Sequence, residues 1–206
     1  MNIESLLTKI EFHQPKVNVQ ALERLVLEHL KWNKTFNISA FRDEHSVKIY
    51  QIIDSLSVYP FIDTGRLLDI GTGPGFPGLP LAICFPDLHI TLLDSSSKKL
   101  AFARHIQALL ELKNVDVIHA RIEKYEPDLL FDQIISRAFT DLSGMISVSL
   151  PLLADNGQIL AMKGQRIETE VTESLKTHQQ CSIEVHQVPH IVDEHRVVAV
   201  IKRIKA

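Results

Sequence analysis

The pattern of apolar and polar residues divides the chain into two parts. In the first part the apolar residues recur every three or four positions, which is the spacing of a helix face. On this basis residues 19–32 and 43–59 are predicted to be helices. Asp43 is placed to cap the second helix and Pro60 to end it. Residues 1–64 are therefore expected to form a helical extension.

In the second part, short apolar runs alternate with helical patterns. Strands are predicted at 66–70, 89–94, 115–119, 131–136, 157–162, 182–188 and 195–203. Helices are predicted at 78–85, after the serines at 95–97, at 141–153 and at 165–177. This alternation is typical of an α/β fold with a doubly wound, mostly parallel, seven-stranded sheet. The last two strands have no helix between them, so they are expected to pair antiparallel and to leave one reversed strand at an edge.

Composition restricts the class of protein. The 206 residues are enough for one domain with an extension, and 45% apolar with 23% charged residues is typical of a soluble globular chain. No apolar run is long enough to cross a bilayer, and the N-terminus carries no export signal. Cys84 and Cys181 lie far apart, which fits a reducing cytoplasm and predicts neither a disulfide framework nor a zinc site.

A glycine-rich stretch lies at the end of the first predicted strand, residues 66–70. It begins at Asp69 and reads DIGTGPGFPG. Gly71, Gly73 and Gly75 allow positive φ angles and a close approach of a ligand to the backbone. Asp94 ends the next strand, where a carboxylate can accept hydrogen bonds from both hydroxyls of an adenosine ribose. The stretch therefore predicts a site for an adenosine-containing cofactor.

This loop has two interpretations. Gly73, Gly75 and Gly78 satisfy G-x-G-x-x-G, the pattern that binds the pyrophosphate of a dinucleotide. However, Pro74 and Pro77 remove two of the amides that a pyrophosphate needs. The acidic residue before the glycines suits a cationic amino-acid end, which S-adenosylmethionine has. We therefore predict S-adenosylmethionine, with a nicotinamide cofactor as the alternative.

Counted from Gly71, the first glycine after the strand, Phe76 stands where the dinucleotide pattern has a glycine, which also disfavours a dinucleotide. Further donor contacts are expected after the third strand. Ile122 and Glu123 follow the third strand, beside the expected adenine, where Ile122 can pack on the ring and Glu123 can bond its edge. A solvated surface loop is the alternative interpretation of these charged residues.

The residues after the fourth strand face the reacting atom in such folds. Here they read Ser-Arg-Ala-Phe, and not the Asx-Pro-Pro-aromatic tetrapeptide common in enzymes that methylate exocyclic amines. Methylation of a pyrimidine carbon needs a nucleophilic cysteine, but Cys84 lies in a predicted helix away from the strand ends. Lys163 stays available as a base for a hydroxyl target.

A target that is already nucleophilic fits these residues better. Guanine N7 carries a free lone pair and can attack a sulfonium methyl without a base, so the enzyme needs mainly to position it. Arg137 can contact the guanine, a phosphate or the donor, and Phe139 can stack on the base. The alternatives are that Arg137 pairs with a carboxylate at the end of a sheet strand and that Phe139 is a core residue.

Seven stretches carry a resemblance to a known family. They are WNKTFNIS (32–39), IIDSL (52–56), DIGTGPGFPGLPLAI (69–83), LLDSSSKKLAF (92–102), ARIEKY (120–125), ISRAF (135–139) and MKG (162–164). Together they resemble the small-subunit ribosomal RNA methyltransferase G family, also called glucose-inhibited division protein B. The resemblance runs over essentially the whole chain, and the P-G-x-P-L tail of the glycine stretch is its most specific part.

This resemblance implies a class I methyltransferase fold. It also implies transfer of methyl from S-adenosylmethionine to N7 of one guanine in the decoding region of bacterial 16S ribosomal RNA, with the small ribosomal subunit as partner. Carried over residue by residue, the donor site of the family falls on Gly71, Phe76, Ile122, Glu123 and Arg137.

One position departs from the family pattern. The family usually has a histidine three residues before its Asp-Ser-Leu, whereas this chain has Gln51 before Asp54-Ser55-Leu56. We therefore assign no general acid or base, and we expect Arg137 to act by positioning.

Contact with RNA must come from a local patch, because the net charge is −3. The candidates are Lys34, Lys98, Lys99, Arg121, Phe139 and Lys163. Scattered solubilising charge is the alternative. We expect a monomer that needs no metal. Two other functions stay open: a nicotinamide-dependent oxidoreductase, and a non-catalytic donor-binding module in ribosome assembly.

Overall fold

The computed structural model describes residues 1–191 and 195–204. Its centre is one seven-stranded sheet in the order β3-β2-β1-β4-β5-β7-β6. The strands are β1 (Gly65–Ile70), β2 (Leu88–Asp94), β3 (Val115–His119), β4 (Phe131–Arg137), β5 (Leu153–Lys163), β6 (Cys181–Gln187) and β7 (Val197–Arg203). The helices are α1 (Ile3–Lys9), α2 (Val19–Phe36), α3 (Glu44–Val47), α4 (Asp54–Leu56), α5 (Gly78–Cys84), α6 (Ser97–Leu109), α7 (Leu142–Ser149) and α8 (Ile167–Thr177).

The sheet has the predicted mostly parallel arrangement. Strands β1 to β5 pair parallel, and β7 pairs antiparallel with both β5 and β6. The antiparallel pairing thus lies at the expected end of the sheet. The reversed strand itself is one place in from the edge, because β7 inserts between β5 and β6 and gains hydrogen bonds on both sides.

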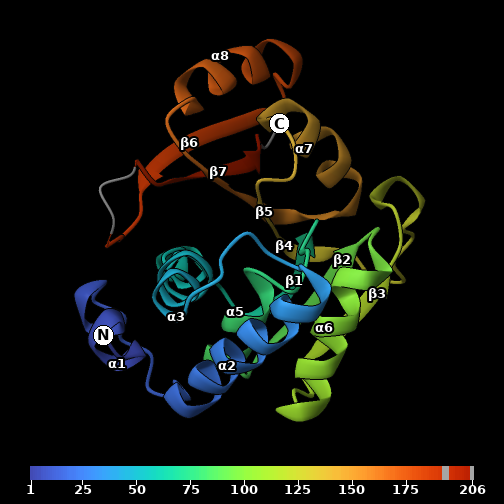
Figure 1. The fold of residues 1–206 in the computed structure, drawn as a ribbon. Helices are drawn as coiled ribbons and strands as arrows, with labels where there is room; N and C mark the ends of the chain where they lie inside the picture. The colour runs from blue at the N-terminus through green and yellow to red at the C-terminus, as the bar shows by residue number, and fades with distance from the viewer. Residues whose placement is uncertain (192–194, 205–206) are drawn as a thin grey trace.

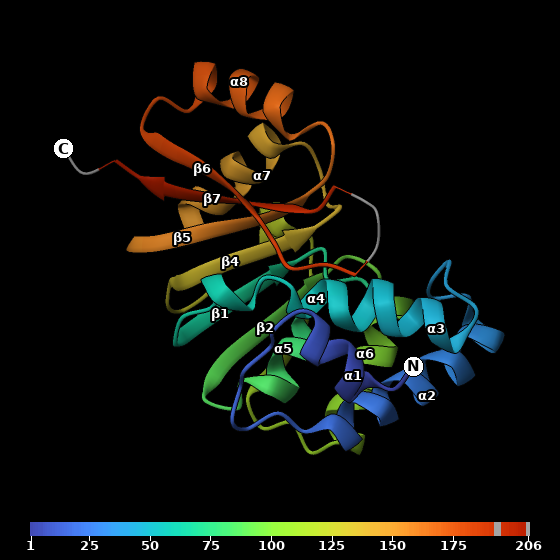
Figure 2. The same cartoon turned by 90° about the vertical axis from the view of Figure 1, so that its left-hand side faces the viewer.

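Helices cover both faces of the sheet. Helices α1 to α6 lie on one side, and α7 and α8 lie on the other (Figures 1 and 2). Two hydrophobic clusters fill the two interfaces, and neighbouring residues of β1 alternate between them: Leu67 belongs to the first cluster and Leu68 to the second. This alternation follows from the twofold side-chain period of a strand that is buried on both faces.

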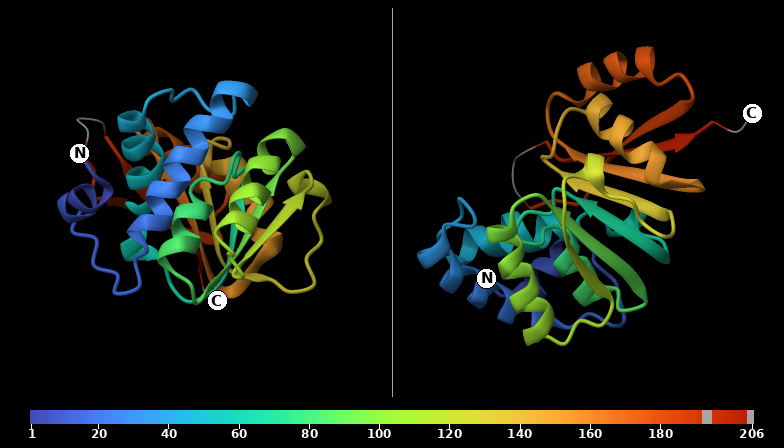
Figure 3. Two further views of the ribbon diagram at one scale, coloured as in Figure 1. Left: turned by 60° about the horizontal axis from the view of Figure 1, so that its bottom comes forward. Right: turned by 90° about the vertical axis from the view of Figure 1, so that its right-hand side faces the viewer.

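The N-terminal helices pack into the same core as the sheet. The first cluster runs from Ile3 of α1 and Leu22 of α2 to Ile90 and Leu92 of β2. Figure 3 shows α2 beside α5 and α6, in front of the strands in its left-hand view. The helical extension therefore packs mainly against α5 and α6 and shares the core on this face of the sheet.

The second predicted N-terminal helix contains an irregular turn. Asp43 caps it as expected, with its side chain accepting a hydrogen bond from the Ser46 amide. Between α3 and α4 the chain forms a π-helix at Lys48–Ile53, and the helix ends at Leu56, before Pro60. A π-helical turn widens the helix locally and is frequent at functional sites.

Two further boundaries differ from the prediction. The helix expected at 141–153 ends at Ser149 and gives way to a 3₁₀ turn at Leu150–Leu152, with Pro151 inside the turn. As a result β5 begins at Leu153, earlier than the apolar run predicted. The apolar positions of 150–153 fit a helix face as well as a buried strand, so periodicity did not separate the two.

Candidate functional site

The glycine loop between β1 and α5 is held by its own amides. Gly71 and Thr72 both donate to the Leu93 carbonyl, at 2.9 and 3.1 Å. Gly75 and Phe76 donate to the Thr72 carbonyl, at 3.0 and 2.9 Å. The loop is therefore a closed turn tied to the end of β2.

The two remaining loop amides bind carboxylates. Gly73 donates to Asp94 and Gly78 donates to Asp69, both at 2.8 Å. Within residues 71–78, all of which the structure describes, every backbone N–H thus has a partner inside the protein. The two prolines in this range carry no N–H group. A pyrophosphate needs unused amides at this place. The loop does not offer them, so its geometry argues against the dinucleotide interpretation.

Asp69 lies at the bottom of the loop and is fully buried. Its Oδ2 accepts hydrogen bonds from the Thr72 hydroxyl at 2.6 Å and from the Gly78 amide at 2.8 Å. Its Oδ1 is buried without a partner among the described residues. Burial raises the pKa of Asp69 to about 7, against the opposing effect of these hydrogen bonds. An unpartnered carboxylate oxygen beneath the loop suits a ligand with a cationic end.

Asp94 ends β2, and two backbone amides fix the orientation of its carboxylate. Its Oδ2 accepts from the Gly73 amide at 2.8 Å, and its Oδ1 accepts from the Ser96 amide at 2.7 Å. An ionised carboxylate has about four acceptor positions, so each oxygen can still accept one hydroxyl. The residue is half-buried, which leaves room for a ligand to approach. Asp69 and Asp94 therefore fit the donor that the sequence predicts.

The other predicted donor residues lie around this loop in different environments. Phe76 is buried in the core, with its ring edge-on to His29 at 5.7 Å. Ile122 is buried in the turn after β3, and Glu123 beside it is exposed. Phe76 therefore supports the loop from the core side. Ile122 and Glu123 lie next to the end of β2, because the Ala120 amide donates a hydrogen bond to the Asp94 carbonyl at 3.2 Å.

Arg137, at the end of β4, is fixed by the π-helix. Its Nη1 donates to the Tyr50 carbonyl at 2.7 Å and to Asp54 Oδ2 at 2.9 Å. Its Nη2 donates to Gln51 Oε1. Gln51, at the position that departs from the expected family pattern, thus helps to hold the arginine in place. Arg137 thus has a carboxylate partner, but Asp54 lies in α4 and not at the end of a strand, where the alternative interpretation placed that partner.

Asp54 joins two arginines. Its Oδ1 also lies 3.1 Å from Nε of Arg196, which precedes β7. The side chain of Asp54 is only 14% exposed, so both pairs are shielded from water. No sequence pattern marks Asp54 or Arg196 as site residues, because the ion pairs join segments more than 80 positions apart.

A cavity of about 1050 Å³ lies beside this cluster. Side chains from the π-helix, the ends of β4 and β5, the start of β7 and α8 line it, among them Tyr50, Arg137, Phe139, Arg166 and Arg196. Among the predicted donor residues only Arg137 lines this cavity. Its position at the carboxyl ends of β4 and β5 makes it suitable for the methyl acceptor.

Phe139 separates the cavity from the glycine loop. It follows Ala138, which has a φ of 55°, and its ring lies over Gly71 so closely that a Cβ there would come within 2.7 Å of Phe139 Cδ2. The side chain is 39% exposed and lines the cavity. Phe139 is therefore a surface residue between the two halves of the site and not a core residue.

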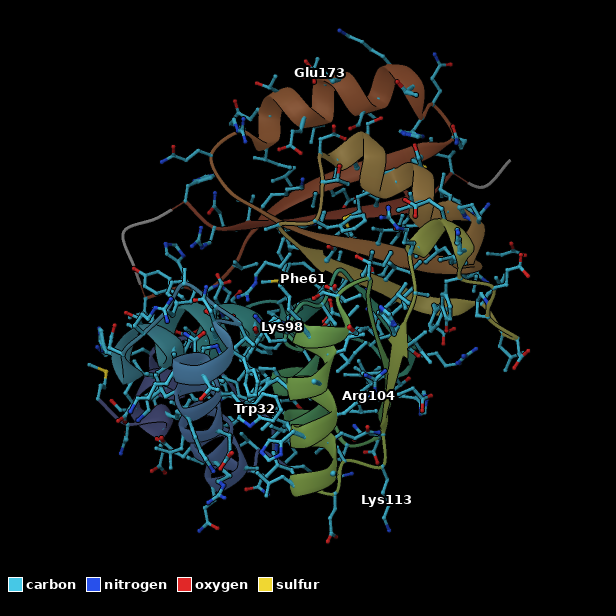
Figure 4. The ribbon with its side chains drawn as sticks, turned by 45° about the vertical axis from the view of Figure 1, so that its right-hand side comes forward. Trp32, Phe61, Lys98, Arg104, Lys113 and Glu173 are labelled. Atoms are coloured by element: carbon cyan, nitrogen blue, oxygen red, sulfur yellow. The ribbon has the colours of Figure 1, made fainter. Side chains whose placement is uncertain are left out.

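The other predicted RNA contacts lie in two kinds of place. Lys34, Lys98, Lys99 and Arg121 are exposed outside the cavity. Figure 4 shows Lys98 at one end of α6, the end where the helix begins, and Lys113 beyond the other end. Lys163 lines the cavity, but its ammonium group is bound to Glu170 and to the Thr140 carbonyl, both at 2.7 Å.

Comparison with known proteins identifies the family. The chain matches the family model for rRNA small subunit methyltransferase G over residues 18–199. It belongs to this family. The protein named ribosomal RNA small subunit methyltransferase G from Hydrogenovibrio crunogenus is 43% identical over 93% of this chain and 89% of its own length. The protein of the same name from Legionella pneumophila is 41% identical over 96% and 94%.

Solved structures agree in fold. A SAM-dependent methyltransferase from Aquifex aeolicus superposes with a TM-score of 0.61 and 16% identity, over 77% of this chain and 93% of that one. The glycopeptide N-methyltransferase MtfA, solved with S-adenosyl-L-homocysteine, superposes with a TM-score of 0.62 and 10% identity, over 75% and 87%. These neighbours confirm the predicted class I methyltransferase fold.

Family membership also confirms the predicted enzyme class. The chain is an S-adenosylmethionine-dependent rRNA methyltransferase. The alternatives, an oxidoreductase and a non-catalytic module, find no support. Among the described residues no helix is long and apolar enough to span a membrane. In the same residues no group of three or more His, Cys, Asp or Glu side chains is arranged to hold a metal.

Proposed function

We propose that this protein transfers the methyl group of S-adenosylmethionine to N7 of one guanine in the decoding region of bacterial 16S ribosomal RNA. The observation that supports this most is the glycine loop, whose amides are all used internally and which opens beside a separate cavity with Arg137 on its wall. The loop suits a donor without phosphates, and the cavity provides a place for the acceptor.

The residues act by binding and positioning. The donor supplies a methyl on a sulfonium, which guanine N7 can attack in line without losing a proton. Asp94 holds the ribose, and Ile122 and Glu123 flank the adenine. Arg137, locked by its hydrogen bonds to the π-helix, orients the guanine or the donor, and Phe139 stacks on the base. No residue is assigned a proton-transfer role.

The remaining assignments are proposals on the same footing. Gly71, Gly73 and Gly75 shape the donor site, together with Asp69 and Phe76. Lys34, Lys98, Lys99, Arg121 and Lys163 contact RNA. Residues 1–64 form a helical extension that closes one side of the acceptor cavity, and residues 65–206 form the methyltransferase domain. We further propose a monomer that works in the cytoplasm without a metal.

One experiment tests the reaction. The protein is incubated with radiolabelled S-adenosylmethionine and small ribosomal subunits from cells that lack this modification. We expect label in 16S ribosomal RNA, and digestion to nucleosides should release 7-methylguanosine. Label in another nucleoside would contradict the N7 assignment, and no label would contradict the activity.

A binding measurement tests the donor separately. S-adenosylmethionine should raise the melting temperature of the protein, because a ligand that binds only the folded state stabilises it. NAD at the same concentration should not. A shift with NAD alone would contradict the proposed donor site.

A further inference from the structure

Two aromatic rings on the wall of the acceptor cavity are not used by the proposed mechanism. Phe41 and Tyr50 are stacked with ring centroids 5.1 Å apart and an interplanar angle of 8°. Both side chains line the cavity, and both are half-buried. We propose that this pair, the aromatic platform, stacks on an unpaired nucleobase of the RNA next to the methylated guanine. The proposal rests on the proposed function, because it names a second base of the same substrate.

The platform is held rigidly on the Phe41 side. The Phe41 carbonyl accepts a hydrogen bond from Asn33 Nδ2 at 2.7 Å, and its amide donates to Ser39 Oγ at 3.1 Å. Asn33 is buried and also bonds both the amide and the carbonyl of Ser39, at 2.9 and 3.0 Å. These bonds fix the loop before α3, so the Phe41 ring is presented at little further cost in entropy.

Tyr50 is held next to the reacting groups. It lies in the π-helix, and its carbonyl accepts the 2.7 Å hydrogen bond from Arg137. Tyr50 of the platform is thus joined by a direct hydrogen bond to Arg137, the residue expected to orient the target guanine. A base on the platform would therefore be a close neighbour of the methylated nucleotide.

The rest of the cavity fits an RNA strand. Arg166 lines the same cavity and is exposed, and an arginine side chain is suited to phosphate contacts. The volume of about 1050 Å³ is at the upper end of sites for one small ligand, so it leaves room for more than the target base. Phe139 lies at the border with the glycine loop and is assigned to the target guanine. The platform is a second stacking surface from a different part of the chain.

Steady-state kinetics with undermodified small subunits test the platform. The variants are Phe41→Leu and Tyr50→Leu, with Phe41→Tyr and Tyr50→Phe as variants that keep an aromatic face. Loss of one base-stacking contact is expected to lower kcat/KM for the RNA by about 5-fold to 100-fold. The aromatic variants should stay within about twofold of the wild type, and the affinity for S-adenosylmethionine should not change.

The matched control is Phe36→Leu. Phe36 is 41% exposed and lies 5.0 Å from Trp32 in another aromatic pair, but it does not line the cavity. It should transfer methyl as the wild type does. Equal losses in Phe36→Leu and Tyr50→Leu, or leucine variants as active as the wild type, would overturn the platform. So would a loss of donor affinity in the leucine variants, since it would indicate a packing role.

A fluorescence measurement covers the case in which the leucine variants fold poorly. Tyr50→Trp in a Trp32→Phe background places the only indole on the platform, and a stacked base should quench it when 16S ribosomal RNA is added. Phe36→Trp in the same background should not be quenched. If the fluorescence of Trp at position 50 is not quenched at RNA concentrations that support methyl transfer, the aromatic platform does not stack on a base and the proposal is wrong. Wild-type protein that transfers no methyl would instead overturn the proposed function itself.

Discussion

The donor site and the acceptor cavity are built over very different distances along the chain. The hydrogen bonds that shape the glycine loop join residues at most 22 positions apart, such as Gly71 to Leu93 and Gly73 to Asp94. The bonds that shape the cavity join Arg137 to Tyr50 and Asp54, 87 and 83 positions away. The first half is a strand–turn–helix unit with its neighbouring strand, and the second exists only after the N-terminal helices have docked.

This contrast means that the two halves depend on different kinds of contact. The glycine turn is closed by bonds to the neighbouring strand, at the edge where ligands of open α/β sheets bind. The cavity depends on a π-helix, on Gln51 and on two arginines around one aspartate, so substitutions there can change the cavity without altering the glycine loop. Phe139, which touches Gly71 and lines the cavity, is where the two halves meet.

The largest effect is expected at Asp54 in the cavity wall. Asp54→Ala leaves the guanidinium groups of Arg137 and Arg196 without their shared carboxylate, so the free energy of unfolding should fall by about 3 kcal/mol. Urea denaturation measures it. The control is Asp87→Ala, which removes an exposed ion pair with Lys16 and should change little. Equal losses in the two variants would mean that the Asp54 cluster does not hold the cavity together.

On the donor side the largest effect is expected at Asp94. Asp94→Ala removes the ribose acceptor and the partner of the Gly73 amide, so binding of S-adenosylmethionine should weaken by about 2–3 kcal/mol. Isothermal titration calorimetry measures the affinity. The control is Asp116→Ala on the adjacent strand β3, whose carboxylate pairs with exposed His89. Unchanged affinity in Asp94→Ala would contradict the ribose role.

A smaller effect is expected when alanine replaces Gly71, which lies under Phe139, or Gly73, which does not. Gly71 and Gly73 have φ angles of 67° and 60°, so alanine costs about 1–2 kcal/mol at either position. A Cβ on Gly71 also meets Phe139 Cδ2 at 2.7 Å, whereas the nearest atom at Gly73 is Lys99 Cδ at 3.8 Å. Gly71→Ala should therefore lose about 1 kcal/mol more in thermal or urea unfolding. Equal losses would show that Phe139 moves aside freely.

At pH 7 the smallest effect is expected at His29, behind the loop. Its ring packs against Phe76 and Phe102, it is fully buried, and neither ring nitrogen has a partner among the described residues. Burial lowers the pKa of His29 from 6.5 to about 4. Between these pH values the unfolded chain binds the proton and the folded chain does not, so stability falls as the pH drops from 6.5 toward 4.

His29→Leu should remove this pH dependence. At pH 7 the variant is expected to be more stable by about 1 kcal/mol, because it no longer buries an unpaired polar ring. The advantage should grow as the pH falls to 5. Urea denaturation at several pH values measures it, with His13→Leu at an exposed position as control. A constant difference between variant and wild type across this range would contradict the assignment to His29.

Local sequence patterns were enough to predict the parallel sheet, the glycine loop, and the positions of Asp69 before the loop and Asp94 at the end of the next strand. Each depends on short-range order: an apolar run that fits a buried strand, glycines at positions with positive φ, and a carboxylate at the end of the next strand. Such features act within one strand–turn–helix unit, so residue type and spacing were enough to predict them.

The assembled fold alone settles what Arg137 binds, where β7 inserts, and that Phe41 and Tyr50 stack beside the cavity. Arg137 was visible in the sequence, but its partners come from a π-helical turn that has no pattern of its own in the chain. Contacts between segments more than 80 positions apart depend on how helices dock on a sheet, and docking is set by the shape of the assembled core. Residue spacing carries no information about that shape.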